Sequence, residues 1–150
     1  MILDFKGVNF AYGNHKILDQ SDFSMAEGEF AYLVGKSGCG KSTFLQLCYF
    51  NLLPQSGEIK ICGFSAKDAS QKSIPQLRQK LGVVFQDFKL LSDRTVFENL
   101  SYILEINGYP RKKIRNRVEA VLSDLGLLHL KNAFPKTLSG GEQQRTAIGR

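Results

Sequence analysis

Apolar and polar residues alternate in parts of the first sixty positions in a way that predicts strands. Over residues 2–12 the apolar side changes once, at Gly7, as it does in a strand that contains a bulge. Gly13-Asn14 has the composition of a turn, and Ile17-Leu18 then begins another strand. Residues 58–62 alternate again, which predicts a third, half-buried strand.

Other segments have the spacing and the end residues of helices. Ser73 stands before Ile74-Pro75, as an N-cap stands before an early proline. Thr95 and Glu98 form the pattern of a capping box. Over residues 114–125, apolar residues recur at every third or fourth position. The predicted helices cover residues 43–50, 73–82, 95–106 and 114–125.

Two short runs are apolar at every position, namely Phe30–Val34 and Val83–Phe85. A continuous apolar run of this length is typical of a strand that is buried on both faces of a sheet. Both runs are therefore predicted to be core strands, and the fold class is predicted to be α/β.

Directly after the first of these runs, Gly35 to Ser42 match the phosphate-loop pattern G-x-x-x-x-G-K-[ST]. Glycines let successive amides point inward, and the helix that follows adds the positive end of its dipole. Lys41 can reach the β and γ phosphates, and the Ser42 hydroxyl can bind Mg²⁺. A plain turn between strand and helix is the alternative. The residues predicted to hold the nucleotide are Gly35, Ser37, Gly38, Cys39, Gly40, Lys41, Ser42 and Thr43.

A second helix opening follows near the end of the sequence, in Leu138-Ser-Gly-Gly-Glu-Gln-Gln-Arg145. Ser139 can be the N-cap and Glu142 its capping-box partner. Gly140 and Gly141 leave the first amides uncovered, so a phosphate could approach them closely. Taken alone, the segment also fits an ordinary capped helix.

Composition sets limits on these interpretations. The chain of 150 residues is long enough for one domain, and it contains no apolar run that could span a bilayer. Its three cysteines fit no metal-binding spacing and are predicted to be reduced thiols. His15 and His129 are predicted to be surface or loop side chains.

The net charge of +6 comes largely from residues 111–117, which include five basic side chains. Such a run is usually a solvated helix face. Attraction to an anionic membrane surface is the better functional alternative, because no motif for binding nucleic acid is present.

The two glycine-rich openings together resemble the ATP-binding subunits of the ABC ATPase family, whose signature motif reads LSGGEQQR here. The resemblance implies a P-loop NTPase fold: a RecA-like core, an antiparallel β-subdomain and a helical signature subdomain. It also implies ATP and Mg²⁺ as cofactors. In this family two subunits pair head to tail, so Ser139, Gly140 and Gly141 would contact a nucleotide bound to the other copy of a homodimer.

The same resemblance assigns roles to two further residues. Tyr12 falls where the family has an aromatic ring that stacks on adenine, although a core aromatic is the alternative. Gln86 matches the family's Q-loop glutamine, which senses Mg²⁺ and the attacking water. It is therefore the expected catalytic residue and a second metal contact.

Residues 88–99 narrow the resemblance to the cell-division branch of the family, with Asp93 and Arg94 as its distinctive pair. A surface ion pair at a helix start is the alternative for these two residues. The resemblance implies an ATPase on the cytoplasmic, inner face of the bacterial plasma membrane, together with a polytopic membrane partner. An exporter or lipoprotein-release ATPase and a non-catalytic ATP-binding scaffold remain alternatives.

The family pattern continues beyond the signature with a Walker B strand, a D-loop and a switch histidine, which have no counterpart in these residues. We therefore expect a fragment of a longer reading frame that binds ATP without family-like turnover and is prone to aggregate. The expected domain layout is a β-subdomain with the P-loop core over about 1–87. A helical subdomain with the signature follows over about 88–150.

Overall fold

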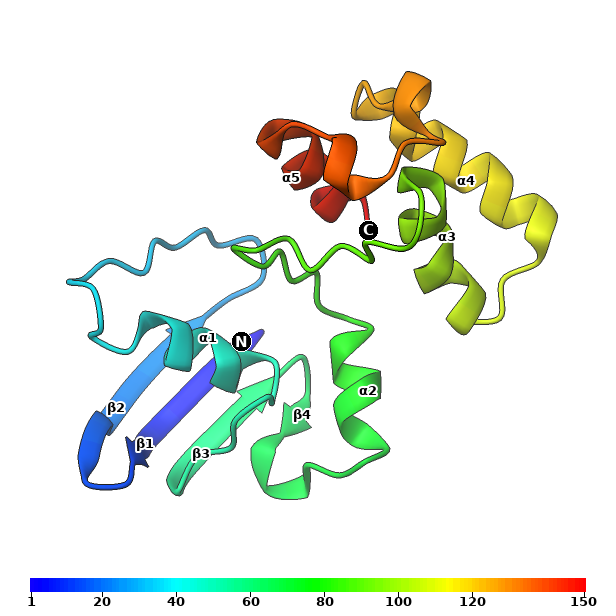
Figure 1. Cartoon of the computed structure of the whole chain (residues 1–150). Coiled ribbons are helices and arrows are strands. Elements are labelled where there is room, and N and C mark those ends of the chain that lie inside the picture. The colour runs from blue at the N-terminus through cyan, green and yellow to red at the C-terminus, as the bar shows by residue number, and fades with distance from the viewer. The chain divides into compact units, whose positions relative to one another are not determined.

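The N-terminal part of the chain forms a four-stranded antiparallel sheet in the order β2-β1-β3-β4 (Figure 1). The pairings of β1 with β2 and with β3 both shift register beside Gly7, whose φ is +54°, so the predicted bulge is confirmed. The predicted turn at Gly13-Asn14 joins β1 to β2. The strands are β1 (Leu3–Tyr12), β2 (His15–Met25), β3 (Ser56–Ile61) and β4 (Phe64–Ser65).

Helix α1 (Lys41–Cys48) packs on this sheet through aromatic side chains. Phe44 stacks on Phe5 with ring centroids 4.8 Å apart, and it meets Phe23 edge-on at 5.4 Å. Leu47 is fully buried in the same cluster. These contacts anchor the helix that follows the phosphate loop.

Helix α2 (Ser73–Arg78) differs from its prediction at both ends. Lys72 is the N-cap and Ser73 the first helical residue, because the Ser73 hydroxyl accepts a bond from the Ser70 amide and donates one to the Asp68 carbonyl. The helix also ends at Arg78, before Gly82. The Arg78 guanidinium donates to the Tyr49 and Phe50 carbonyls.

The remaining helices pack on one another around a second apolar cluster, which includes Val96, Val118, Leu122 and Leu127. They pack tightly at Gly149, where an added Cβ would lie 2.6 Å from Leu125 Cδ1. The capping boxes predicted for the first and last of them are present. The helices are α3 (Val96–Ile106), α4 (Arg111–Asp124) and α5 (Gly140–Gly149).

The predictions of core strands at Phe30–Val34 and Val83–Phe85 are wrong for this structure. Neither segment pairs with a strand, and the side chains of Phe30 and Val34 are about four-fifths exposed, at 79% and 82%. An extended apolar segment becomes a strand only when a neighbour satisfies its amides and carbonyls. The four strands of the sheet pair only with one another.

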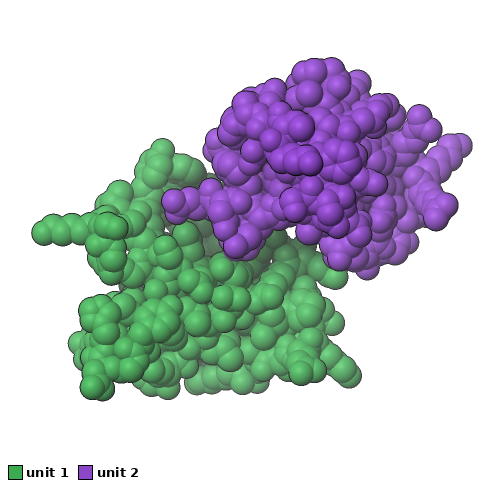
Figure 2. Space-filling view, viewed as in Figure 1, with its two compact units in different colours: residues 1–82 green, residues 83–150 purple.

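The structure describes residues 1–150, and these divide into two compact units, residues 1–82 and 83–150 (Figure 2). The first contains the sheet with α1 and α2, and the second contains α3, α4 and α5. No helix in either unit combines the length and apolar character needed to cross a bilayer.

Candidate nucleotide site and signature helix

The phosphate-loop segment leads into α1 without any side-chain cap. The N-cap is Gly40, with φ +97° in the left-handed region, and the first turn of α1 contains no acidic residue. Gly38 is also left-handed, with φ +81°. The first amides of α1 are therefore left for an external acceptor, at the end of the helix where its dipole favours an anion.

Gly40 is required for a second reason, which is its packing. A Cβ at this position would collide with the side chain of Ile17, which belongs to strand β2. At Gly38, in contrast, an added Cβ would meet no atom within 4 Å. The loop is therefore seated on the sheet at Gly40 and stands clear of it at Gly38.

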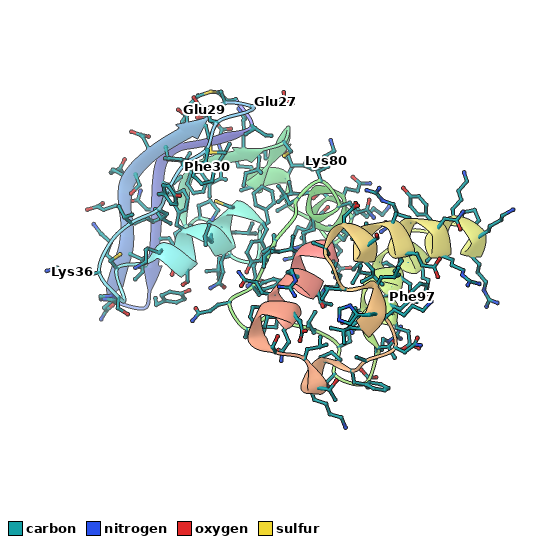
Figure 3. The ribbon with its side chains drawn as sticks, turned by 90° about the horizontal axis from the view of Figure 1, so that it is seen from above. Glu27, Glu29, Phe30, Lys36, Lys80 and Phe97 are labelled. Carbon is teal, nitrogen blue, oxygen red and sulfur yellow. The ribbon has the colours of Figure 1, made fainter.

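The side chain of Lys41 folds back over the loop. Its Nζ donates to the carbonyls of Gly35 and Lys36, both at 2.8 Å, and lies 3.9 Å from Cys39 Sγ. Lys36, on the same loop, points outward (Figure 3). Because both bonds of the ammonium go to neutral carbonyls, charged phosphate oxygens would be stronger partners.

The neighbouring hydroxyls differ in their surroundings. Ser42 is exposed, and its hydroxyl forms no hydrogen bond within the chain, so this oxygen is available to a Mg²⁺ ion. Thr43 is buried. No group of three or more His, Cys, Asp or Glu side chains could hold a metal by itself.

The signature segment begins its helix in the opposite way. The Ser139 hydroxyl accepts from the Glu142 amide at 3.4 Å, while Glu142 Oε2 accepts from the Ser139 hydroxyl and amide at 2.8 Å each. The bond from the Ser139 hydroxyl, and after it the bond from the Ser139 amide, holds the pKa of Glu142 below its usual value. Gly140 and Gly141 remain exposed, and an added Cβ at Gly140 would meet nothing within 4 Å.

A family model described as ABC transporter matches residues 18–150, which include both helix openings. The chain belongs to the ABC transporter family. Its fold class is thereby confirmed, and the solved dimeric structure of the bacterial ABC transporter cassette MJ0796 superposes with a TM-score of 0.88 at 31% identity. That comparison covers 98% of this chain and 67% of the cassette. The cassette was also solved in a post-hydrolysis state bound to ADP and Pi.

Curated relatives of this chain include two kinds of ATP-binding protein. The cell division ATP-binding protein FtsE of Streptococcus pneumoniae is 48% identical over 127 residues, which are 85% of this chain. The methionine import ATP-binding protein MetN of Carboxydothermus hydrogenoformans is 42% identical over 135 residues, or 90% of this chain. The chain spans 55% of the length of that FtsE and 40% of that MetN.

This ABC chain places its predicted adenine-stacking residue at a strand end. Tyr12 is the last residue of β1, and its side chain is 49% exposed. One edge contact, with Phe10 at 5.1 Å, holds the ring. Exposure of this extent fits stacking better than the alternative of a core aromatic. The stacking itself stays a prediction.

Gln86 lies in the second unit and is exposed, at the start of a tightly wound loop. Phe88 and Lys89 both have positive φ, at 57° and 48°. Asp87 and Lys89 form an ion pair at 2.7 Å, and their hydrogen bond lowers the pKa of the carboxyl. Arg150, from the end of the signature helix, donates to the Lys89 carbonyl at 2.6 Å. Participation of Gln86 in Mg²⁺ binding stays a prediction.

Asn99 is a buried polar residue to which the sequence pattern gave no individual role. Its side chain is fully buried, and Nδ2 donates to the carbonyls of Leu91, Arg94 and Thr95. Its Oδ1 accepts from the Leu91 amide at 2.8 Å. One side chain thus fixes the loop that carries the branch-specific pair. A polar residue at an apolar position of a predicted helix was the available sequence signal.

The branch-specific pair itself is not an ion pair. The Arg94 guanidinium lies over the Tyr102 ring, 4.6 Å from its centroid, and Asp93 forms no salt bridge. The alternative of a surface ion pair between these two residues is therefore excluded. Their value as markers of the cell-division branch stays a prediction.

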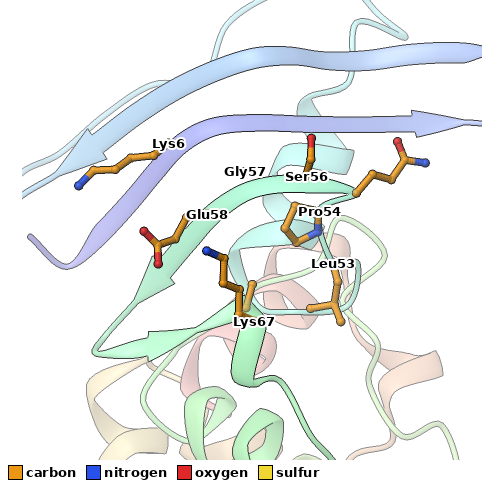
Figure 4. Close-up of a pocket in the computed structure, with 9 residues that line it drawn as sticks. Lys6, Leu53, Pro54, Ser56, Gly57, Glu58 and Lys67 are labelled. Atoms are coloured by element: carbon orange, nitrogen blue, oxygen red, sulfur yellow. The ribbon is translucent and has the colours of Figure 1, made fainter.

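One further feature, a cavity, lies apart from the phosphate loop. A cavity of about 610 Å³ beside β3 is lined by Lys6, Glu58 and Lys67 among others (Figure 4), but no residue of the phosphate loop reaches it. Lys6 and Glu58 already pair with Asp4 and Lys60. All three cysteines are free thiols, and burial raises the pKa of Cys48 to about 12.

Proposed function

We propose that this chain supplies the ATP-binding and ATP-hydrolysing subunit of a membrane-associated ABC complex of the FtsE type. The observation that carries the proposal is the Lys41 ammonium, held on two loop carbonyls beside an uncapped helix start. Phosphate oxygens would replace those carbonyls as stronger acceptors. Kinship with FtsE supports the cell-division assignment.

Within this proposal, the loop from Gly35 to Thr43 holds the phosphates and Tyr12 stacks on the adenine. The Ser42 hydroxyl and Gln86 bind Mg²⁺, which supplies charge stabilisation for phosphoryl transfer. Gln86 also positions the attacking water. Residues to about 87 then form the β-subdomain and P-loop core, and residues from about 88 form the helical subdomain.

Two copies pair head to tail, so that Ser139, Gly140 and Gly141 of one copy meet the γ-phosphate held by the other. The exposure of both glycines at the start of α5 supports this role, because bare amides at a helix N-terminus bind anions. Kinship with a cassette solved as a dimer supports the pairing.

The assembled ATPase lies on the cytoplasmic face of the bacterial plasma membrane and acts with a polytopic partner of the FtsX type. Kinship with MetN favours a second candidate, the ATPase of a transporter. Co-purification separates the two: the cell-division proposal requires an FtsX-type protein in the complex.

The central experiment compares two lysines of one loop. We expect Lys41→Ala to weaken binding of a fluorescent ATP analogue by roughly 10- to 100-fold, because a charge-assisted bond contributes about 1.5–3 kcal/mol. Lys36→Ala is the control, because that side chain points outward, and it should change affinity less than about threefold. Equal losses in the two variants would contradict the proposal.

A further reading of the Lys41→Ala variant tests hydrolysis. If the complex is a motor, this variant loses turnover and still binds its membrane partner. If partner binding is lost and wild-type turnover is absent, the chain is a nucleotide-binding scaffold instead.

A further inference from the structure

The connection between α3 and α4 exposes apolar and cationic side chains together. We name residues 106–117 the hairpin patch. Ile106 is 62% exposed and Tyr109 is 53% exposed, on either side of a left-handed turn at Gly108. The Tyr109 amide bonds to the Leu104 carbonyl at 3.1 Å, which fixes the turn to the end of α3. The aromatic ring is thus presented on an ordered backbone.

All the charged side chains of the hairpin patch are basic. Residues 106–117 include five basic and no acidic side chains, and all five basic ones are exposed. Arg115 pairs with Glu119 at 3.4 Å. The remaining four, Arg111, Lys112, Lys113 and Arg117, form no ion pair. Glu119, the acidic partner of Arg115, is further shared with Lys131 at 3.5 Å.

This arrangement does not stabilise the helix that carries it. Arg111, Lys112 and Lys113 occupy the first turn of α4, which has no acidic residue and no side-chain cap. Cations at a helix N-terminus oppose the dipole. The buried face of α4 is supplied by Ile114, Val118 and Leu122, so the cations are not needed for packing either. Their clustering is unexplained by the fold.

We propose that the hairpin patch binds the surface of an anionic bilayer, with its cations on lipid phosphates and Tyr109 and Ile106 in the interfacial layer. Cations next to an exposed tyrosine and an aliphatic side chain match the layered chemistry of that surface, where charge lies outside and aromatic rings sit below it. Nucleic acid would match the charge but leaves Ile106 without a partner. The contact needs neither nucleotide nor a protein partner, so it stands apart from the proposed function.

Vesicle sedimentation with the 150-residue chain tests the charge. Vesicles of phosphatidylglycerol and phosphatidylcholine at about 3:7 are compared with phosphatidylcholine alone. We expect binding to the anionic vesicles only, weakening as salt rises. Lys112→Gln/Lys113→Gln should reduce binding by about thirtyfold, since each lysine contributes roughly fivefold. Lys67→Gln/Lys72→Gln removes the same charge from the other unit and should reduce it far less.

Fluorescence tests the apolar half, because the chain contains no tryptophan. Tyr109→Trp should shift its emission to the blue on anionic vesicles. Phe134→Trp, at a position 40% exposed in the same unit, should not shift. Equal shifts at both positions, or equal losses in the two lysine pairs, would overturn the proposal. Binding of duplex DNA or RNA by the patch, without binding to vesicles, would also overturn it.

Discussion

Helices α1 and α5 both begin at glycine-rich segments, but their N-termini are built in different ways. Helix α1 begins at a left-handed glycine without any side-chain cap, whereas α5 begins with a complete capping box. The first leaves its amides and its lysine for a ligand, and its backbone is held by packing at Gly40. In the second, the capping box occupies the Ser139 and Glu142 amides, and Gly140 and Gly141 present their own amides as a surface. The contrast fits the proposed roles, in which the start of α1 would hold a phosphate and the start of α5 would close over one.

The largest expected effect is on the uncapped opening. Gly40→Ala combines a left-handed backbone with a collision against Ile17, so we expect a loss of about 3 kcal/mol and of ATP-analogue binding. Chemical denaturation and fluorescence titration measure the two. Gly38→Ala has the backbone strain without the collision, and should cost only about 1 kcal/mol. Equal costs would show that packing on β2 does not seat the loop.

The next effect is at the far end of the signature helix. Gly149→Ala places a Cβ 2.6 Å from Leu125 and 3.1 Å from Val121, so we expect a loss of about 2 kcal/mol from overpacking. The matched change at the near end, Gly140→Ala, meets no atom and should be neutral or stabilising. Thermal unfolding of both variants checks the difference, and a tolerated alanine at 149 would contradict it.

A smaller effect distinguishes the role of Ser139 as a helix cap from its proposed contact with a nucleotide. Ser139→Ala removes one capping box and should cost about 1 kcal/mol of stability. Thr95→Ala removes the matching box of α3 and should cost about as much. Only the Ser139 variant should also weaken ATP-dependent dimerisation, measured by light scattering. If both variants dimerise equally well, Ser139 is a cap and no more.

The smallest effect is on pH dependence. Because the pKa of Glu142 is lowered in the folded chain, its contribution to stability is present above the ordinary carboxyl range and is lost as pH falls through the lowered value. Melting temperatures measured from neutral to acidic pH should therefore converge for wild type and Glu142→Gln at the acidic end. A constant gap between them would exclude this linkage.

Patterns of neighbouring residues were sufficient to predict much of the fold and of the candidate site. The bulge at Gly7, both capping boxes and the phosphate loop depend on residues close together in the chain, and all were predicted. The strands expected at 30–34 and 83–85 depend on distant partners, which no local pattern can supply. The same holds for the Arg150 bond to the Lys89 carbonyl. A polar residue at an apolar helix position was the one signal for Asn99, and its partners could not be predicted because all of them are backbone groups.

The buried Asn99 has a consequence for how the loop before α3 moves. The Leu91 amide proton is held by a side chain that water cannot reach unless the helix itself separates from its neighbours. Its exchange with solvent deuterium should therefore be as slow as that of the α3 core amides, although it lies outside any helix or strand. This loop segment would thus stay closed to solvent for as long as the helical bundle beside it.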